Sequence, residues 1–213
     1  MRILTINTAS EFICFLISAY CLLRDKNAYW RGFMFYMLLV CLTELGGLFL
    51  RSISVSNSML YTGFLIIECS MVSAFFYYIF YKYYPKSKWI YAWFILFLLV
   101  YILELISNHF AGYSYRTTTF MSVAFVIASL YYYFLITRDE HFRKLGSDPQ
   151  FWVVNGILFF YFGSTASNVF FEYLVHEVTP QSASIRYITF NILNILLYSC
   201  WSYAFICRYR QRN

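Results

Sequence analysis

The sequence predicts an all-α integral membrane protein, a seven-transmembrane-helix bundle that forms a single polytopic membrane domain over residues 1–213. Composition is the first reason, since 61% of the residues are hydrophobic and only 12% are charged, whereas soluble domains carry about 25% charged residues. Pattern is the second reason. Apolar runs of the length that crosses a bilayer, roughly 20 helical residues, fill most of the chain, and their continuity favours helices over the alternating strands of a barrel.

Short polar segments divide these runs and set the bounds of each predicted helix. The first run ends at RDKNAYWR, the third at PKSK and the fifth at RDEHFRKLGSDPQ, and HEVTPQSASIR separates the last two. All three prolines, Pro85, Pro149 and Pro180, fall in the connections, where a residue without an N–H does not disturb a helix. The predicted helices cover residues 3–23, 32–50, 58–81, 89–107, 117–137, 151–175 and 187–207.

The basic residues predict the orientation of the bundle. When the connections are numbered alternately, one side receives Arg24, Lys26, Arg31, Lys82, Lys86, Lys88, Arg138, Arg143, Lys144, Arg208, Arg210 and Arg212, and the other receives Arg2, Arg51, Arg116 and Arg186. Because cytoplasmic loops are enriched in Lys and Arg, we expect the N-terminus outside and the C-terminus in the cytoplasm. The location expected is a cell membrane, specifically a bacterial inner membrane. The net charge of +6 is then explained by topology and by contact with the lipid bilayer, so no nucleic-acid partner is predicted.

Five glutamates interrupt the apolar runs at a similar depth. At about 1.5 Å per residue, each lies in or near the outer half of its helix. They are Glu11, Glu44, Glu68, Glu104 and Glu172. Ionisable side chains inside a membrane are costly and usually face the bundle interior or a water-filled cavity, so we expect a polar chamber that opens to the outside.

Polar side chains at helical spacing extend this prediction. On the seventh run, Asn191, Asn194, Tyr198 and Ser202 recur at steps of three or four and share one face, and Asn168 belongs to a similar stripe on the sixth run. The candidate ligand-binding residues are Glu11, Glu44, Glu68, Glu104, Asn168, Asn191 and Asn194. A structural explanation stays open, in which polar residues hold the helices together, Gly46 and Gly47 permit close approach, and carboxylates pair with Arg51, Arg116 or Arg186.

Tyrosine and phenylalanine concentrate in stretches such as FFYYIFYKYY at 75–84. One interpretation is an aromatic pocket for a flat ligand. The favoured interpretation is a belt at the membrane interface, because rings with a polar tip prefer the headgroup level.

An internal repeat of three helices, one linking helix and three helices is also suggested, because Tyr61, Phe64 and Ser73 of the third run match Tyr187, Phe190 and Ser199 of the seventh. A sugar transporter of the SWEET type has this plan but carries prolines within its helices, which this chain lacks. A microbial rhodopsin needs a lysine in the seventh helix, and none is there. An alkaline-ceramidase-type hydrolase needs several histidines around zinc. This chain has only His109, His141 and His176, and His141 lies in a connection predicted to be cytoplasmic.

The TEL motif of the second run, FWVVNGILFFYFG opening the sixth and NILNILLYS in the seventh resemble uncharacterised bacterial seven-helix membrane proteins that often accompany signalling genes. This resemblance implies a role in sensing and a cytoplasmic or membrane signalling partner.

The predicted function is therefore a non-enzymatic receptor or signal-input protein that binds a small-molecule ligand or a proton in the outer chamber. No cofactor, catalytic residue or metal ligand is predicted. Two alternatives remain open. One is a small-solute or proton-coupled transporter, suggested by the repeat, and the other is an intramembrane hydrolase with Glu11, Glu104 and His109 as acid–base candidates.

Overall fold

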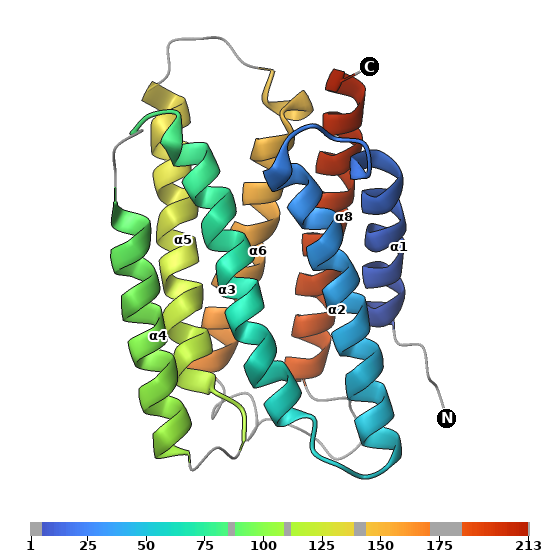
Figure 1. Cartoon of the computed structure of the whole chain (residues 1–213), viewed down its shortest axis with the longest axis vertical. Helices are drawn as coiled ribbons and strands as arrows, with labels where there is room; N and C mark the ends of the chain where they lie inside the picture. The colour runs from blue at the N-terminus through green and yellow to red at the C-terminus, as the bar shows by residue number, and fades with distance from the viewer. Residues whose placement is uncertain (1–5, 85–87, 109–111, 139–143, 171–184, 213) are drawn as a thin grey trace. The chain divides into compact units, whose positions relative to one another are not determined.

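The computed structural model describes residues 6–84, 88–108, 112–138, 144–170 and 185–212, of which 185 and 186 are described by their backbone alone (Figure 1). These residues form seven α-helices and one short 3-10 helix and contain no strand. The all-helical prediction is confirmed. The elements are α1 (Ile6–Leu22), α2 (Ala28–Ser52), α3 (Ser58–Tyr81), α4 (Trp89–Ser107), α5 (Tyr115–Arg138), η1 (Leu145–Ser147), α6 (Pro149–Val169) and α8 (Ile185–Arg212).

Five of the described helices are long and apolar enough to cross a membrane. They are α2, α3, α4, α5 and the stretch Tyr187–Arg212 of α8. The first helix, α1, has 17 residues, a length of about 26 Å at 1.5 Å per residue, and falls just below a full span. The architecture is that of a helical membrane protein.

Local capping explains where the observed bounds differ from the predicted ones. Helix α2 begins at Ala28 and not at 32, because the Asn27 side chain accepts a hydrogen bond from the Tyr29 N–H at 2.9 Å. Helix α6 begins at Pro149 and not at 151, because Asp148 caps it in the same way, through the Gln150 N–H at 2.9 Å.

The far ends of the last two helices also differ. Helix α6 ends at Val169 and not at 175, and positions 171–175 lie outside the described residues. Helix α8 continues past 207 to Arg212, with Arg210 and Arg212 in its last turn, where cations stabilise the helix dipole.

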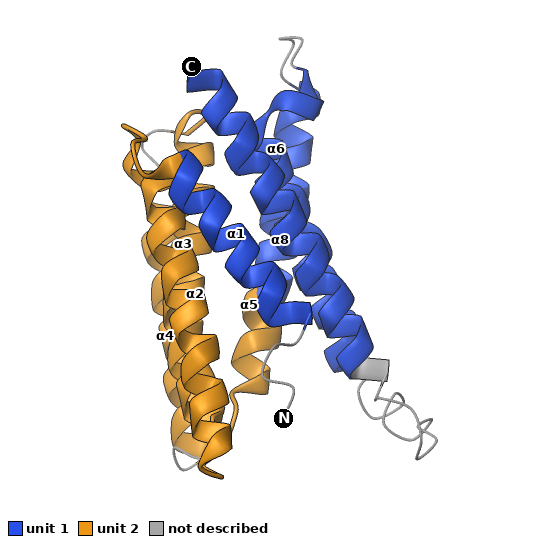
Figure 2. Ribbon diagram, turned by 90° about the vertical axis from the view of Figure 1, so that its right-hand side faces the viewer, with its two compact units in different colours: residues 1–21, 122–213 blue, residues 22–121 orange. Residues whose placement is uncertain are grey.

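The chain divides into two compact units (Figure 2). Unit 1 consists of residues 1–21 and 122–213, and unit 2 consists of residues 22–121. Unit 1 contains α1, α6, α8 and most of α5, and unit 2 contains α2, α3, α4 and the start of α5. The division groups α1 with α6 and α8, so it does not follow the three-one-three plan. Both the repeat and the single-domain assignment stay predictions.

Unit 2 is held together largely by aromatic rings. Phe33 of α2 packs edge to face on Phe75 of α3, with ring centroids 5.1 Å apart, and both rings are buried. Helix α4 joins α3 through the indole N–H of Trp93, which donates to Ser73 Oγ at 2.9 Å. Helix α3 runs antiparallel to both α2 and α4 (Figure 1).

Unit 1 depends on small residues between α6 and α8. Gly156 and Gly163 are seven residues apart, hence on one face of α6. A Cβ at Gly156 would lie 3.1 Å from Trp201 Cδ1, and a Cβ at Gly163 would lie 2.7 Å from Leu193 Cδ1. The two glycines therefore let α8 approach α6 closely, the arrangement in which membrane helices pack best.

Candidate functional site

Glu44, a candidate site residue on α2, is hydrogen-bonded to the next helix. The hydroxyl of Tyr61 on α3 donates to Glu44 Oε2 at 3.0 Å, and both side chains are half-buried. A neutral phenol thus meets an ionisable carboxyl group on a helix that is apolar enough to span a membrane. Because hydrogen bonds to charged groups are worth about 1.5–3 kcal/mol, the strength of this bond depends on the protonation state of Glu44.

The glycine pair that follows Glu44 makes this contact possible. A Cβ at Gly47 would lie 3.0 Å from Tyr61 Cζ and would collide with the Tyr61 hydroxyl. A Cβ at Gly46 would lie 3.3 Å from Leu60 Cδ2. The sequence TELGG thus supplies both the acceptor and the space for the tyrosine ring. We refer to Glu44, Gly47 and Tyr61 as the outer clasp, after the orientation predicted from the basic residues.

A second polar contact joins the opposite ends of the same two helices. The Asn27 side-chain amide donates to the Tyr78 hydroxyl at 3.2 Å, and Tyr29 stacks on Tyr78 with ring centroids 4.8 Å apart. Glu44 lies 17 residues after Asn27, so this inner clasp is about 26 Å from the outer one along α2. The buried aromatic contacts of Phe33 and Phe75 lie between them.

Glu104 has a contact of a different kind. Its Oε1 accepts from the Arg116 N–H at 2.9 Å, and its Oε2 accepts from the Thr117 N–H at 2.7 Å and the Thr117 hydroxyl at 2.6 Å. These N–H groups belong to the first turn of α5, which has no intrahelical acceptor for them. A carboxylate there also complements the helix dipole. Glu104 therefore acts as a cap supplied by α4, and it meets Arg116 through the backbone and not through the guanidinium.

Glu68 shares the α3 face of Tyr61. The two residues are seven positions apart, which places them on one side of the helix and about 10 Å apart along its axis. Glu68 is half-buried, so two of the predicted acids, Glu44 and Glu68, come from the α2–α3 pair.

The remaining candidate residues lie in unit 1. Glu11 is buried on α1, on a polar stripe with Thr8 and Ser18, which are also buried. The side-chain oxygen of Asn7 is buried without a hydrogen-bond partner among the described residues. Asn168 on α6 and Asn191 and Asn194 on α8 are half-buried.

The predicted chamber thus draws on both units, with Glu44, Glu68 and Glu104 in unit 2 and Glu11, Asn168, Asn191 and Asn194 in unit 1. Their convergence into one site stays a prediction, and Glu172 lies outside the described residues. Within the described ranges no three His, Cys, Asp or Glu side chains form a group that could hold a metal. His109, His141 and His176 fall outside those ranges.

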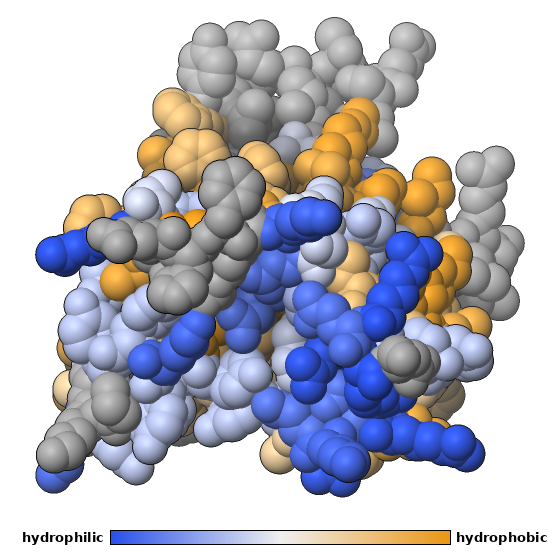
Figure 3. Space-filling view, turned by 90° about the horizontal axis from the view of Figure 1, so that it is seen from above, coloured by the Kyte–Doolittle hydropathy of each residue, from blue (hydrophilic) through white to orange (hydrophobic). Residues whose placement is uncertain are grey.

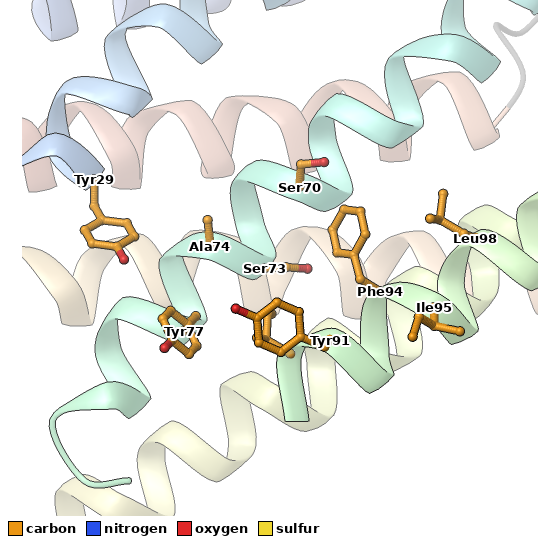
Figure 4. A pocket seen from close by; sticks show the side chains of 10 residues that line it. Tyr29, Ser70, Ser73, Ala74, Tyr77, Tyr91, Phe94, Ile95 and Leu98 are labelled. Atoms are coloured by element: carbon orange, nitrogen blue, oxygen red, sulfur yellow. The ribbon is translucent and has the colours of Figure 1, made fainter. Parts of the chain in front are cut away.

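One pocket is lined by part of the aromatic stretch at 75–84, for which an aromatic pocket was the alternative interpretation and an interfacial belt the favoured one. It has a volume of about 530 Å³ and lies between α3 and α4, with Tyr29 of α2 beside them (Figure 4). Tyr77, which lines it, belongs to the aromatic stretch that was interpreted as an interfacial belt. Tyrosines spaced along one helix do not reveal a hollow, because the hollow depends on where a second helix leaves space.

No protein-family model, curated protein or solved structure matches the chain. The resemblance to bacterial membrane proteins that accompany signalling genes therefore stays a prediction, and the function is inferred from the geometry of this chain.

Proposed function

We propose that the protein is a multi-pass membrane receptor or signal-input protein, in which the α2–α3 pair is the sensing element. A small external solute or a proton engages Glu44 at the outer clasp. The proposal includes seven membrane spans in a bacterial inner membrane, with the N-terminus outside and the C-terminus in the cytoplasm, as the distribution of basic residues favours.

The observation that supports this proposal is the outer clasp itself. An ionisable group within a membrane helix is costly and marks a functional site by default. Here the Glu44 carboxyl group links two spans through Tyr61, over a glycine that leaves room for the tyrosine ring. A proton or a cationic solute at Glu44 changes the charge that Tyr61 meets and therefore the strength of the contact between the helices.

The two helices provide a route for the signal. The inner clasp joins α2 to α3 at the end where Arg24, Lys26 and Arg31 are exposed on the α2 side and Lys82 on the α3 side. Figure 3, which views the end at the top of Figure 1, shows hydrophilic side chains gathered there. A shift of α3 against α2, set off at the outer clasp, changes the spacing of these basic groups, which a cytoplasmic or membrane signalling partner would contact. Ligand and proton act by favouring one of two arrangements of the pair.

The test is hydrogen exchange of the protein in nanodiscs, measured by mass spectrometry between about pH 5 and pH 8. We expect the protection factors of residues 23–27 and 82–84, which are exchange rates corrected for the intrinsic rise of amide exchange with pH, to change with pH in the wild type and to stay constant in the Glu44→Gln, Glu68→Gln double variant. Tyr101→Phe is the matched control, because it removes another tyrosine hydrogen bond of unit 2, to the Thr62 carbonyl, and should keep the response. An unchanged pH and ligand response in the double variant would refute the proposal.

No specific observation on the described residues supports a transporter or an intramembrane hydrolase, so both functions stay predictions.

A further inference from the structure

The pocket between α3 and α4 is open to the surface that faces lipid when these helices span a membrane. Only Phe97, Tyr101 and Glu104 of α4 are buried, whereas its large apolar side chains such as Leu96, Leu99 and Leu103 are exposed. Two residues that line the pocket, Tyr91 and Ile95, are 68% and 62% exposed. A molecule that enters here therefore comes from the bilayer.

The lining changes in character along the pocket. Tyr29 and Tyr77 lie at one end, and Phe94 and Leu98 lie toward the other (Figure 4). Tyr29 is the second residue of α2 and Tyr77 is four residues before the end of α3, so the tyrosine end is also the end that carries the basic connections. The pocket has a polar rim and an apolar interior.

The two serine hydroxyls in the pocket lining are hydrogen-bonded to other groups of the protein. Ser70 Oγ donates to the Ile66 carbonyl at 2.6 Å, and Ser73 Oγ accepts from the Trp93 indole at 2.9 Å. Both hydroxyls are engaged by the protein, so the interior of the pocket suits a hydrocarbon chain. The volume of about 530 Å³ falls in the range of roughly 300–1,000 Å³ that is usual for small-molecule sites.

Two exposed lysines, Lys82 and Lys88, follow or precede residues of the pocket lining by a few positions in the sequence. Lys88 occupies the N-cap of α4, where it makes no side-chain capping bond, and the first turn of α4 contains no acidic residue. The positive end of the helix dipole thus adds to a lysine, at a position where an anion is favoured. Lys88 is two residues before the pocket residue Ile90, and Lys82 is five residues after Tyr77; both lysines are exposed.

We infer that this pocket binds an anionic phospholipid of the surrounding bilayer. One acyl chain lies between α3 and α4 against Ala74, Phe94 and Leu98, and the phosphate lies at the start of α4 near Lys82 and Lys88. This inference does not depend on the role of Glu44, because it uses a different pair of helices and the opposite end of α3.

The test is native mass spectrometry of the protein released from nanodiscs that contain equal amounts of phosphatidylglycerol and phosphatidylcholine with identical acyl chains. We expect the wild type to retain phosphatidylglycerol. Retention should fall stepwise in Ala74→Leu and Ala74→Phe, which fill the pocket by different amounts. It should fall about 30-fold in Lys82→Gln, Lys88→Gln, since each lysine near the surface contributes about fivefold.

Matched controls separate the pocket from general surface effects. Ala92→Phe adds the same ring at an exposed α4 position outside the lining, and Lys144→Gln removes an exposed lysine from another connection; both should retain the lipid as the wild type does. Equal retention of the two lipids would overturn the charge argument. Equal retention by Ala74→Phe and Ala92→Phe, or a bound molecule that is no phospholipid, would overturn the pocket assignment.

Discussion

The hydroxyl of Tyr61 reaches across from α3 to Glu44 of α2, 3.0 Å from Oε2, and its ring lies where a side chain at Gly47 would have to be. The carboxylate and the glycine are three residues apart on α2 and so share one face. The position of Tyr61 therefore depends on a titratable group and on helix packing at once. A substitution at Glu44 or at Gly47 should affect both the hydrogen bond and the packing of α2 against α3.

A substitution at Gly47 should separate the two helices. Gly47→Ala places a Cβ against the Tyr61 ring, and such overpacking costs about 1–3 kcal/mol. Thermal unfolding in detergent should show a lower midpoint. Gly63→Ala is the matched control, because no atom lies within 4 Å of a Cβ built there, and alanine in a helix is favoured over glycine by about 1 kcal/mol. The two variants should therefore shift the midpoint in opposite directions, and a shared direction would contradict the packing.

Removing the carboxylate of Glu104 should loosen the start of α5. Glu104→Ala leaves the Arg116 and Thr117 N–H groups without their acceptor, and a buried unsatisfied group costs about 1–3 kcal/mol. Hydrogen exchange of these two amides should become faster. Thr117→Ser is the control, since it keeps a hydroxyl and the backbone donors. Unchanged exchange in Glu104→Ala would show that another group caps α5.

The contact between α6 and α8 should behave as a coupled pair. Gly163→Ala brings a Cβ against Leu193 and should destabilise the protein by about 1–3 kcal/mol. Leu193→Ala alone should also destabilise it, because Leu193 is buried. In the double variant the smaller side chain makes room for the new methyl group, so the measured loss should be smaller than the sum of the single losses. Additive losses would mean that the two residues do not share this space.

The alternation of apolar runs and polar segments was sufficient to predict the helices, but it did not predict all of their ends. The bounds of α3 and α4 agree with the predicted 58–81 and 89–107, because polar segments flank both runs. The early starts of α2 and α6 depend on Asn27 and Asp148 as caps, a signal present in the sequence that apolar periodicity does not register.

The candidate site was predictable in its residue types and not in its partners. Glu44 and the glycine pair were identified from the sequence, but the contact with Tyr61 depends on the register of α3 against α2. Glu104 was predicted as a ligand-binding residue, whereas its hydrogen bonds go to residues 12 and 13 positions later in the chain. Only the fold brings that helix start to the carboxylate.

The most direct test of the sensing element is the distance between the basic ends of α2 and α3. Spin labels attached through unnatural amino acids at the exposed positions Lys26 and Lys82 leave the native cysteines in place. Pulsed electron paramagnetic resonance in nanodiscs then gives the distance distribution at about pH 5 and about pH 8. The proposal predicts two populations whose ratio changes with pH in the wild type and is constant in Glu44→Gln. The same pH dependence in Glu44→Gln would contradict it, because a group other than Glu44 would then control the α2–α3 pair.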